Sequence, residues 1–360
     1  MHKKLALGLL SLPLCLFADG ETDTMQQMPN NRQMKNGQKE MQAKQQRVSL
    51  DSARPESDNG WYIFADALYW HADIGTTDWA FKVDNSAAVE RRHRQRSVDF
   101  KWAWGFKAGI GANIEHGMWD TNLYYTWFHT SSRSRASNVA PDNVIAIIEG
   151  GSAFQSGRIK WSLHYSMFDW ELGGWYYLND VLAIRPHVGV KGGWINQDIK
   201  SPLVEASGNV DRGRFKNNFW GVGPSFGVNT LWVLGNAGKR AEHRFSLFGD
   251  CGGALLYGHF HVKYAQPQYS SVGTLVGGFE VKGLDRNLAV AMLQGIFGLA
   301  WDTDFNQNKN HFTFKLGYEL QYWFRQNQLV KVINGFANGT DRLSDDLALQ
   351  GITAEFRFDF

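Results

Sequence analysis

The chain ends GITAEFRFDF (residues 351–360), and its side chains alternate between apolar and polar. From Ile352 to Phe360 every second residue is apolar, whereas the residues between them, Thr353 to Asp359, are all polar. A period of two predicts a β-strand with one apolar and one polar face. A soluble core and a lipid bilayer both accept such an apolar face, so the rest of the chain has to decide between them.

The same alternation recurs in DFKWAWGFKAGIGANI (99–114), RIKWSLHYSM (158–167), LAIRPHVGVKGGW (182–194) and HFTFKLGYELQYWF (311–324). Strands of soluble sandwiches are typically ~5–6 residues long, whereas a strand that crosses a bilayer needs ~9–11. The long runs therefore predict an all-β fold, a transmembrane antiparallel β-barrel of about 10–12 strands, with more not excluded. In such a barrel the apolar faces meet lipid and the polar faces meet the lumen.

The composition agrees with a barrel in a membrane. The chain holds 15 Trp, 12 Tyr, 24 Phe and 38 Gly among 360 residues, and its formal net charge is +2. Its mean hydropathy is −0.36. Aromatic girdles at the two membrane interfaces explain many rings in a mildly hydrophilic chain. No run of eighteen apolar residues follows the first segment, which excludes a helical membrane protein.

The joints between the alternating segments differ in length in a regular way. Ten segments can be marked: 60–71, 97–113, 117–129, 157–177, 181–198, 214–233, 243–264, 288–302, 311–324 and 347–360. Short and long joints alternate along the chain, as short periplasmic turns and long extracellular loops do in outer-membrane barrels. DWAFKV (78–83) and NVIAIIEG (143–150), in two long joints, are candidates for extra hairpins.

The first segment has the layout of a secretory signal peptide, with Lys3 and Lys4 before an apolar run that ends at Ala18. We therefore expect a signal peptide at 1–18, a flexible Gln- and Met-rich periplasmic leader at 19–59, and the barrel at 60–360. Cleavage would leave Cys251 as the only cysteine, either a lone thiol or a partner for another chain.

Four stretches resemble the major outer membrane proteins of Legionella and chlamydia-like bacteria: WYIFADALYWHAD (61–73), FDWELGGWYYLNDVLAIRPHVGVKGGWINQDI (168–199), NFWGVGPSFGVNTLW (218–232) and FSLFGDCGGALLYGHFHV (245–262). The resemblance implies a porin-like surface protein in the outer membrane of a Gram-negative bacterium. The alternating end also resembles the signal by which outer-membrane assembly machinery recognises its clients, carried by Phe356, Phe358 and Phe360.

Charged side chains on the polar faces are the candidate lumen residues. They are Lys101, Lys107, Asp120, Arg185, Lys191, Lys315, Glu319, Glu355 and Arg357. Mixed charges on the inner wall either set up a field in a wet lumen or form ion pairs that close it. We therefore expect a passive porin for small hydrophilic solutes, with a surface structural or adhesion protein of closed lumen as the alternative.

Other candidates are weaker. The run ERRHRQR (90–96) is either a solvated loop or a patch that binds host-surface polyanions through Arg91, Arg92, Arg94 and Arg96. His164 and His187 are predicted to face the lumen without a catalytic motif, so we expect no enzyme. His259 and His261 share a strand face but lack further ligands, which predicts no metal site and no cofactor. The expected partners are outer-membrane lipids and the assembly machinery, and a homo-oligomer is left open.

Overall fold

The computed structural model describes residues 60–75, 77–84, 92–114, 119–138, 143–146, 152–179, 181–237, 243–305, 310–332 and 340–360. The chain divides into two units, 1–47 and 48–360, and every element below belongs to the second. The signal peptide and the leader predicted for 1–59 lie outside the described residues. No helix in the described part of the chain is long and apolar enough to cross a membrane.

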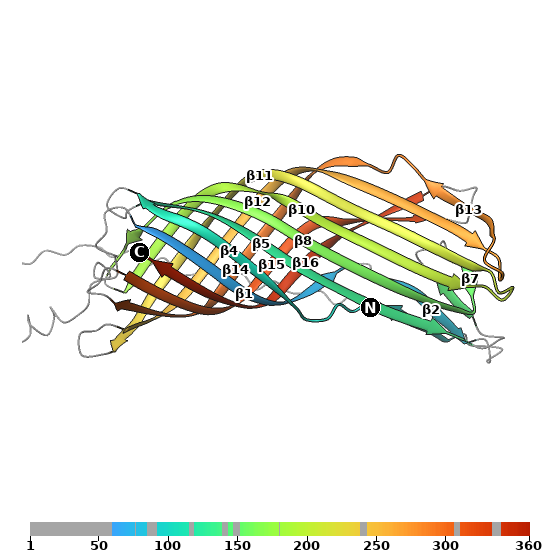
Figure 1. Ribbon diagram of the computed structural model, residues 1–360, viewed down its shortest axis with the longest axis horizontal. Helices are drawn as coiled ribbons and strands as arrows, with labels where there is room; N and C mark the ends of the chain where they lie inside the picture. Colours follow the sequence, from blue (N-terminus) through green and yellow to red (C-terminus); the bar gives the residue numbers. More distant parts are fainter. Residues whose placement is uncertain are drawn as a thin grey trace, which may run out of the picture. The chain divides into compact units, whose positions relative to one another are not determined.

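Ten antiparallel strands form a closed ring (Figure 1). Each pairs with the next barrel strand along the chain, and the first pairs with the last, for example Ala65 opposite Phe356. The ten are β1 (Trp61–Ile74), β4 (Ala103–Ile114), β5 (Trp119–Ser137), β8 (Ser156–Gly174), β10 (Leu182–Val204), β11 (Val210–Ala237), β12 (His243–Tyr269), β14 (Arg286–Phe305), β15 (Asn310–Val332) and β16 (Thr340–Asp359). The ring leaves no edge strand in the barrel, which satisfies the backbone in a lipid environment.

The ten barrel strands coincide with the ten alternating segments, so the predicted fold class is confirmed. The outer surface is apolar where the sequence predicts it: Phe106 and Leu316 are each 46% exposed, and Trp104 is 68% exposed. Such large apolar side chains on the outside of a folded chain are stable only in contact with lipid.

Six shorter strands lie beside the ring. They are β2 (Asp78–Asp84), β3 (Arg92–Ser97), β6 (Asn143–Ala146), β7 (Ser152–Phe154), β9 (Tyr176–Tyr177) and β13 (Leu275–Val281). DWAFKV and the start of NVIAIIEG do form strands, but β2 and β6 pair with each other in a separate four-stranded sheet rather than joining the barrel. β2, β7 and β13 lie at the end of the barrel opposite the C-terminus (Figure 1).

The interior of the barrel changes character along its length. Toward the periplasmic turns it is polar, whereas the half beyond Lys107 holds an apolar core with the fully buried side chains Trp70, Trp161, Leu163, Tyr165, Phe215, Phe219, Phe260 and Trp323. Trp79 of the small sheet belongs to this core, and its ring lies close to Gly157 and Leu203 of the barrel wall. The small sheet therefore packs against the outer part of the barrel interior.

This core reverses one prediction from the sequence. In RIKWSLHYSM the apolar residues Trp161, Leu163 and Tyr165 face inward, so Lys160 and His164 face outward and are exposed. The prediction of an inward His164 is thus wrong, whereas His187, on β10, is buried inside the barrel. The physical reason is that the outer half of the lumen is packed with side chains, so its inner wall is apolar.

Candidate functional site in the barrel lumen

Lys107 lies at the centre of the charged inner wall. Its Nζ is 3.4 Å from an oxygen of Asp66 on β1 and 3.6 Å from an oxygen of Glu319 on β15. Glu319 also accepts hydrogen bonds from Thr353 (2.8 Å) and Gln321 (2.9 Å). The cation is therefore shared by two carboxylates from different strands, and one of those carboxylates is held in place by further donors.

Arg185 organises a second cluster, nearer the periplasmic turns. Its guanidinium binds Asp120 in a bidentate manner, with an Nε–Oδ2 distance of 2.8 Å. It also donates to Asn229 (2.6 Å) and Glu171 (3.3 Å). Glu171 in turn accepts a hydrogen bond of 2.8 Å from the hydroxyl of Tyr124. Bidentate, charge-assisted bonds of this kind fix geometry strongly.

The remaining inward cations predicted from the sequence are paired as well. The pairs are Lys191 with Asp169 (2.5 Å), Lys315 with Glu355 (3.0 Å) and Arg357 with Asp359 (2.6 Å). Lys101 is the exception, because it precedes β4 and is exposed, while Phe100 is buried. Two consecutive exposed residues, Lys101 and Trp102, shift the alternation by one there, so the prediction that Lys101 lines the lumen is wrong.

These charged groups surround a cavity of about 530 Å³ in the periplasmic half of the barrel. Its wall includes Lys107, Arg185, Asp250, Glu319 and Arg357. Asp66, Glu171 and Asp250 were not among the residues predicted from the sequence, although Asp66 has the inward parity of the polar face in WYIFADALYWHAD. Seven of the nine lumen residues predicted from the sequence line the cavity: Lys107, Asp120, Arg185, Lys315, Glu319, Glu355 and Arg357.

Above the cavity, side chains from opposite walls touch each other. The hydroxyl of Tyr165 on β8 donates a hydrogen bond of 2.9 Å to Gln321 on β15, and its ring centroid lies 5.9 Å from that of Trp323. β8 and β15 lie five strands apart in a ring of ten, on opposite sides of the barrel. The hydrogen bond between Tyr165 and Gln321 therefore spans the lumen from one wall to the other and interrupts a water path between these two strands.

β15 itself bends into the lumen above Trp323. Its register with β16 shifts between Trp323 and Asn327, and Arg325 has a φ of 54° in the left-handed region. The following side chains are fully buried, and Gln326 bonds to Gln197 of β10 at 2.8 Å. The bulge therefore places buried side chains of β15 across the lumen, in contact with β10, and we call residues 325–328 the plug. Sequence alternation alone could not reveal it, because a bulge interrupts the alternation.

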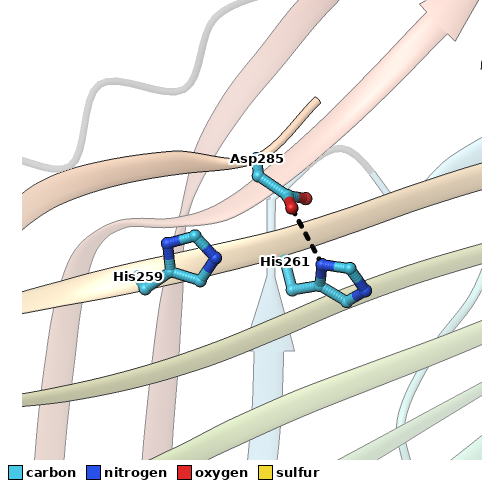
Figure 2. Close-up of side chains that lie close together, drawn as sticks. All are labelled: His259, His261 and Asp285. Carbon is cyan, nitrogen blue, oxygen red and sulfur yellow. Dashed lines mark hydrogen bonds and ion pairs between the residues drawn. The ribbon is translucent and has the colours of Figure 1, made fainter. Parts of the chain in front are cut away.

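A separate cluster of possible metal ligands lies on the outside of β12 (Figure 2). One ligand atom each of His259, His261 and Asp285 lie within 4.8 Å of one another. His261 is hydrogen-bonded to Asp285 (3.0 Å), and Asn287 holds His259 (2.7 Å). Burial would raise the pKa of Asp285, but hydrogen bonds from His261 and from the backbone hold that pKa below its ordinary value. The cluster offers three ligands for a transition-metal ion, and the sequence prediction missed the third because Asp285 is far along the chain.

The other predicted residues lie apart from the lumen. Arg94 and Arg96 lie on β3 of the small sheet, Arg92 begins that strand, and Arg91 lies outside the described residues. Phe356 and Phe360 are half-exposed on the outer face of β16, at 48% and 52%. Their role in assembly stays a prediction.

The fold and the apolar outer belt define the class: this chain is an outer-membrane β-barrel protein. A sequence profile described as Legionella pneumophila major outer membrane protein precursor matches residues 53–360, and the chain belongs to that family. The resemblance seen in the four sequence stretches is thereby confirmed, as is the location in the Gram-negative outer membrane. A comparison with curated proteins found no match.

Solved structures with a similar arrangement are distant. The outer membrane protease OmpT of Escherichia coli is 8% identical, with a TM-score of 0.37, over 84% of this chain and 97% of its own. The toluene transporter TodX of Pseudomonas putida is 10% identical, with a TM-score of 0.26, over 86% of this chain and 91% of its own. A FadL homologue of Pseudomonas aeruginosa is 8% identical, with a TM-score of 0.25, over 85% and 92%.

Proposed function

We propose that this protein is a surface structural barrel whose lumen is closed in its resting state. The observation that carries the proposal is the contact between opposite walls, Tyr165 with Gln321 and Trp323. Barrels of ~8 strands are filled by side chains, whereas ~16 strands leave an aqueous channel. A ring of ten belongs nearer to the filled kind, and the plugging bulge of β15 narrows it further.

The pairing of the charged inner wall supports the same proposal. Five of the inward cations predicted from the sequence have a carboxylate within 4 Å: Lys107, Arg185, Lys191, Lys315 and Arg357. Paired charges largely cancel each other's field, so they would select ions poorly. What they do well is join strands, because Lys107 connects β4 to both β1 and β15. The described geometry therefore favours a rigid wall over a selective ion path.

The second candidate is a passive porin that conducts only when the plug moves. The cavity of about 530 Å³ favours it, because charged groups line this space below the plug. A solute could occupy this half of the barrel if the bulge of β15 swung aside. The two functions differ in one measurable quantity, the conductance of the resting protein.

Removing the rings that bridge the lumen is expected to open it. We predict that full-length protein in a planar bilayer is closed for most of the recording, and that Tyr165→Ala with Trp323→Ala gives frequent openings. The reason is that both rings are buried, at 1% and 0% exposure, and fill the space between opposite walls. Each ring removed is expected to cost up to about 3–5 kcal/mol of stability, so the conductance is recorded only from the fraction of the variant that is folded.

A matched control keeps the test clean. Trp104→Ala also deletes an indole, but that ring is 68% exposed on the lipid face, so we expect no change in conductance. A steady conductance of native protein, equal to that of the Tyr165 and Trp323 variant, would refute the closed lumen and support the porin. A folded variant that stays closed would refute the role of these two rings.

A further inference from the structure

A row of cations crosses the outside of the barrel above its apolar belt. Arg133 of β5 lies opposite Lys160 of β8, Lys160 lies opposite Lys200 of β10, and Lys200 lies opposite Arg214 of β11. All four are exposed and project from the outer face of the wall. We call these four residues the outer cationic row.

The position of this row relative to the membrane follows from the register. Trp127, Trp194 and Trp220 lie in one lateral line across the same strands, and Trp194 and Trp220 are 50% and 52% exposed. Tryptophan belts mark the membrane interface. The outer cationic row lies six residues farther along each strand, which is ~20 Å at ~3.3 Å per residue. With a strand tilt of ~40°, this is ~15 Å beyond the belt. The row therefore lies outside the hydrocarbon core and past the ~5–8 Å that phospholipid head groups add on each side.

The residues between belt and row show the same transition. Proceeding outward, the outer face carries His129 and His164, which stack with ring centroids 4.0 Å apart, and then Ser131 and Ser162 before the cations. Further cations lie on either side of the row; they are Arg135, Arg158, Lys216 and Lys263. The outer face thus passes from aromatic to polar to cationic over a few residues.

The row lacks an ion-pair partner in the described part of the chain. None of its four members forms an ion pair with a carboxylate of a described residue, in contrast to every inward cation of the charged lumen wall. Asp198, opposite Lys216 and two residues before Lys200, lies on the same outer face and forms no ion pair with the row. Like charges directly opposite each other on neighbouring strands destabilise a sheet. Three successive like-charge pairs across four strands therefore call for an anionic partner from outside the chain.

We propose that the outer cationic row binds the phosphates of lipopolysaccharide, the phosphorylated glycolipid of the outer leaflet. Its height suits a head group larger than that of a phospholipid, such as a phosphorylated oligosaccharide. Its charges are complementary to phosphate, and both arginines can bind phosphate oxygens in a bidentate manner. Strand spacing of ~4.8 Å extends the row over ~15 Å, enough to meet more than one phosphate. The proposal does not depend on whether the lumen is open.

The test compares the native protein with a variant in which all four residues of the row become glutamine. Binding to micelles that contain lipopolysaccharide is measured, and the melting temperature is followed with and without it. We expect lipopolysaccharide to raise the melting temperature of the native protein, and the variant to bind at least ~10-fold more weakly. In detergent without lipopolysaccharide the melting temperature of the variant should be equal to or higher than that of the native protein, because the like-charge repulsion is gone.

Controls separate this site from general charge. A second variant, with glutamine at the half-buried Lys82 and at the exposed Arg94, Lys282 and Arg286, loses the same charge elsewhere and should bind like the native protein. Lipid A without phosphates should not discriminate between the native protein and the row variant. Equal binding of lipopolysaccharide by the native protein and the row variant would overturn the proposal. A second result would also overturn it: binding of heparin, a lipid-free polyanion, is weakened in the row variant, whereas binding of lipopolysaccharide is unchanged.

Discussion

A barrel in which Lys107 and Lys191 are both replaced by glutamate is expected not to reach its folded state. Each lysine faces carboxylates inside the barrel, Asp66 and Glu319 for the first and Asp169 for the second. Removing one partner of a buried pair costs ~3–5 kcal/mol. Reversal adds repulsion between like charges, so two reversals approach the ~5–15 kcal/mol by which folded domains are stable. The side chain of Lys107 keeps 16% exposure, which places its share at the lower end.

The measurement is the fraction of heat-modifiable, folded protein in outer-membrane fractions, together with the urea midpoint in detergent. The matched control reverses two exposed lysines, Lys101→Glu and Lys282→Glu, and should fold normally. A folded Lys107 and Lys191 variant whose reversal potential moves toward cations would contradict the expectation. That result would mean solvated charges along an ion path and would restore the porin.

The ring of ten strands could be predicted because lipid, lumen and turns impose three independent patterns on the chain. Long alternation predicts the strands. The joint lengths distinguish the periplasmic from the extracellular end, and the aromatic composition indicates that the outer face meets lipid. The pairing of β1 with β16 follows once all edges must be satisfied. The separate small sheet was not predicted: DWAFKV and NVIAIIEG were expected as parts of extra hairpins, whereas β2 and β6 pair with each other outside the ring. Short strands in long joints carry weak alternation, which does not say where they pair.

The interior was harder to predict because alternation distinguishes two faces without saying which one is inside. The rule of polar inside and apolar outside holds near Arg185, where β10 crosses the lipid. It reverses near Trp161 and Lys160, where the barrel rises beyond the membrane and water replaces lipid outside. There the strands behave like those of a soluble protein, with an apolar core and charged exterior. The outer cationic row was hidden by this reversal.

The ion pairs among the lumen charges could not be predicted from the sequence, for a different reason. Lys107 and Glu319 are brought together by the order of strands around the ring and by their register, not by sequence separation. A shift of one residue in either strand would turn one of them to the lipid. Charge type and inward parity could therefore nominate the residues, but only the closed ring could decide between an ion pair and a solvated charge.

The lipid face allows the sharpest test of the register. Leu316 lies on the outer face of β15, 46% exposed, between Leu299 of β14 and Ala354 of β16. Leu316→Arg is expected to cost ~2–4 kcal/mol near the bilayer midplane. The folded yield in lipid vesicles and the urea midpoint measure the loss. Leu316→Ala, which shortens the side chain without adding charge, should cost much less.

The same substitution placed higher on the wall separates depth from chemistry. Ser131 projects from the outer face of β5, exposed and beyond the tryptophan belt, so Ser131→Arg should cost only ~0–1 kcal/mol, as expected near an interface. If Leu316→Arg and Ser131→Arg were equally harmless, β15 would not face lipid at Leu316, and its register would be wrong by one residue. If both were equally harmful, the membrane would extend to Ser131. The outer cationic row, two residues farther out on β5 at Arg133, would then lie within the hydrocarbon, and that row could not meet lipid phosphates.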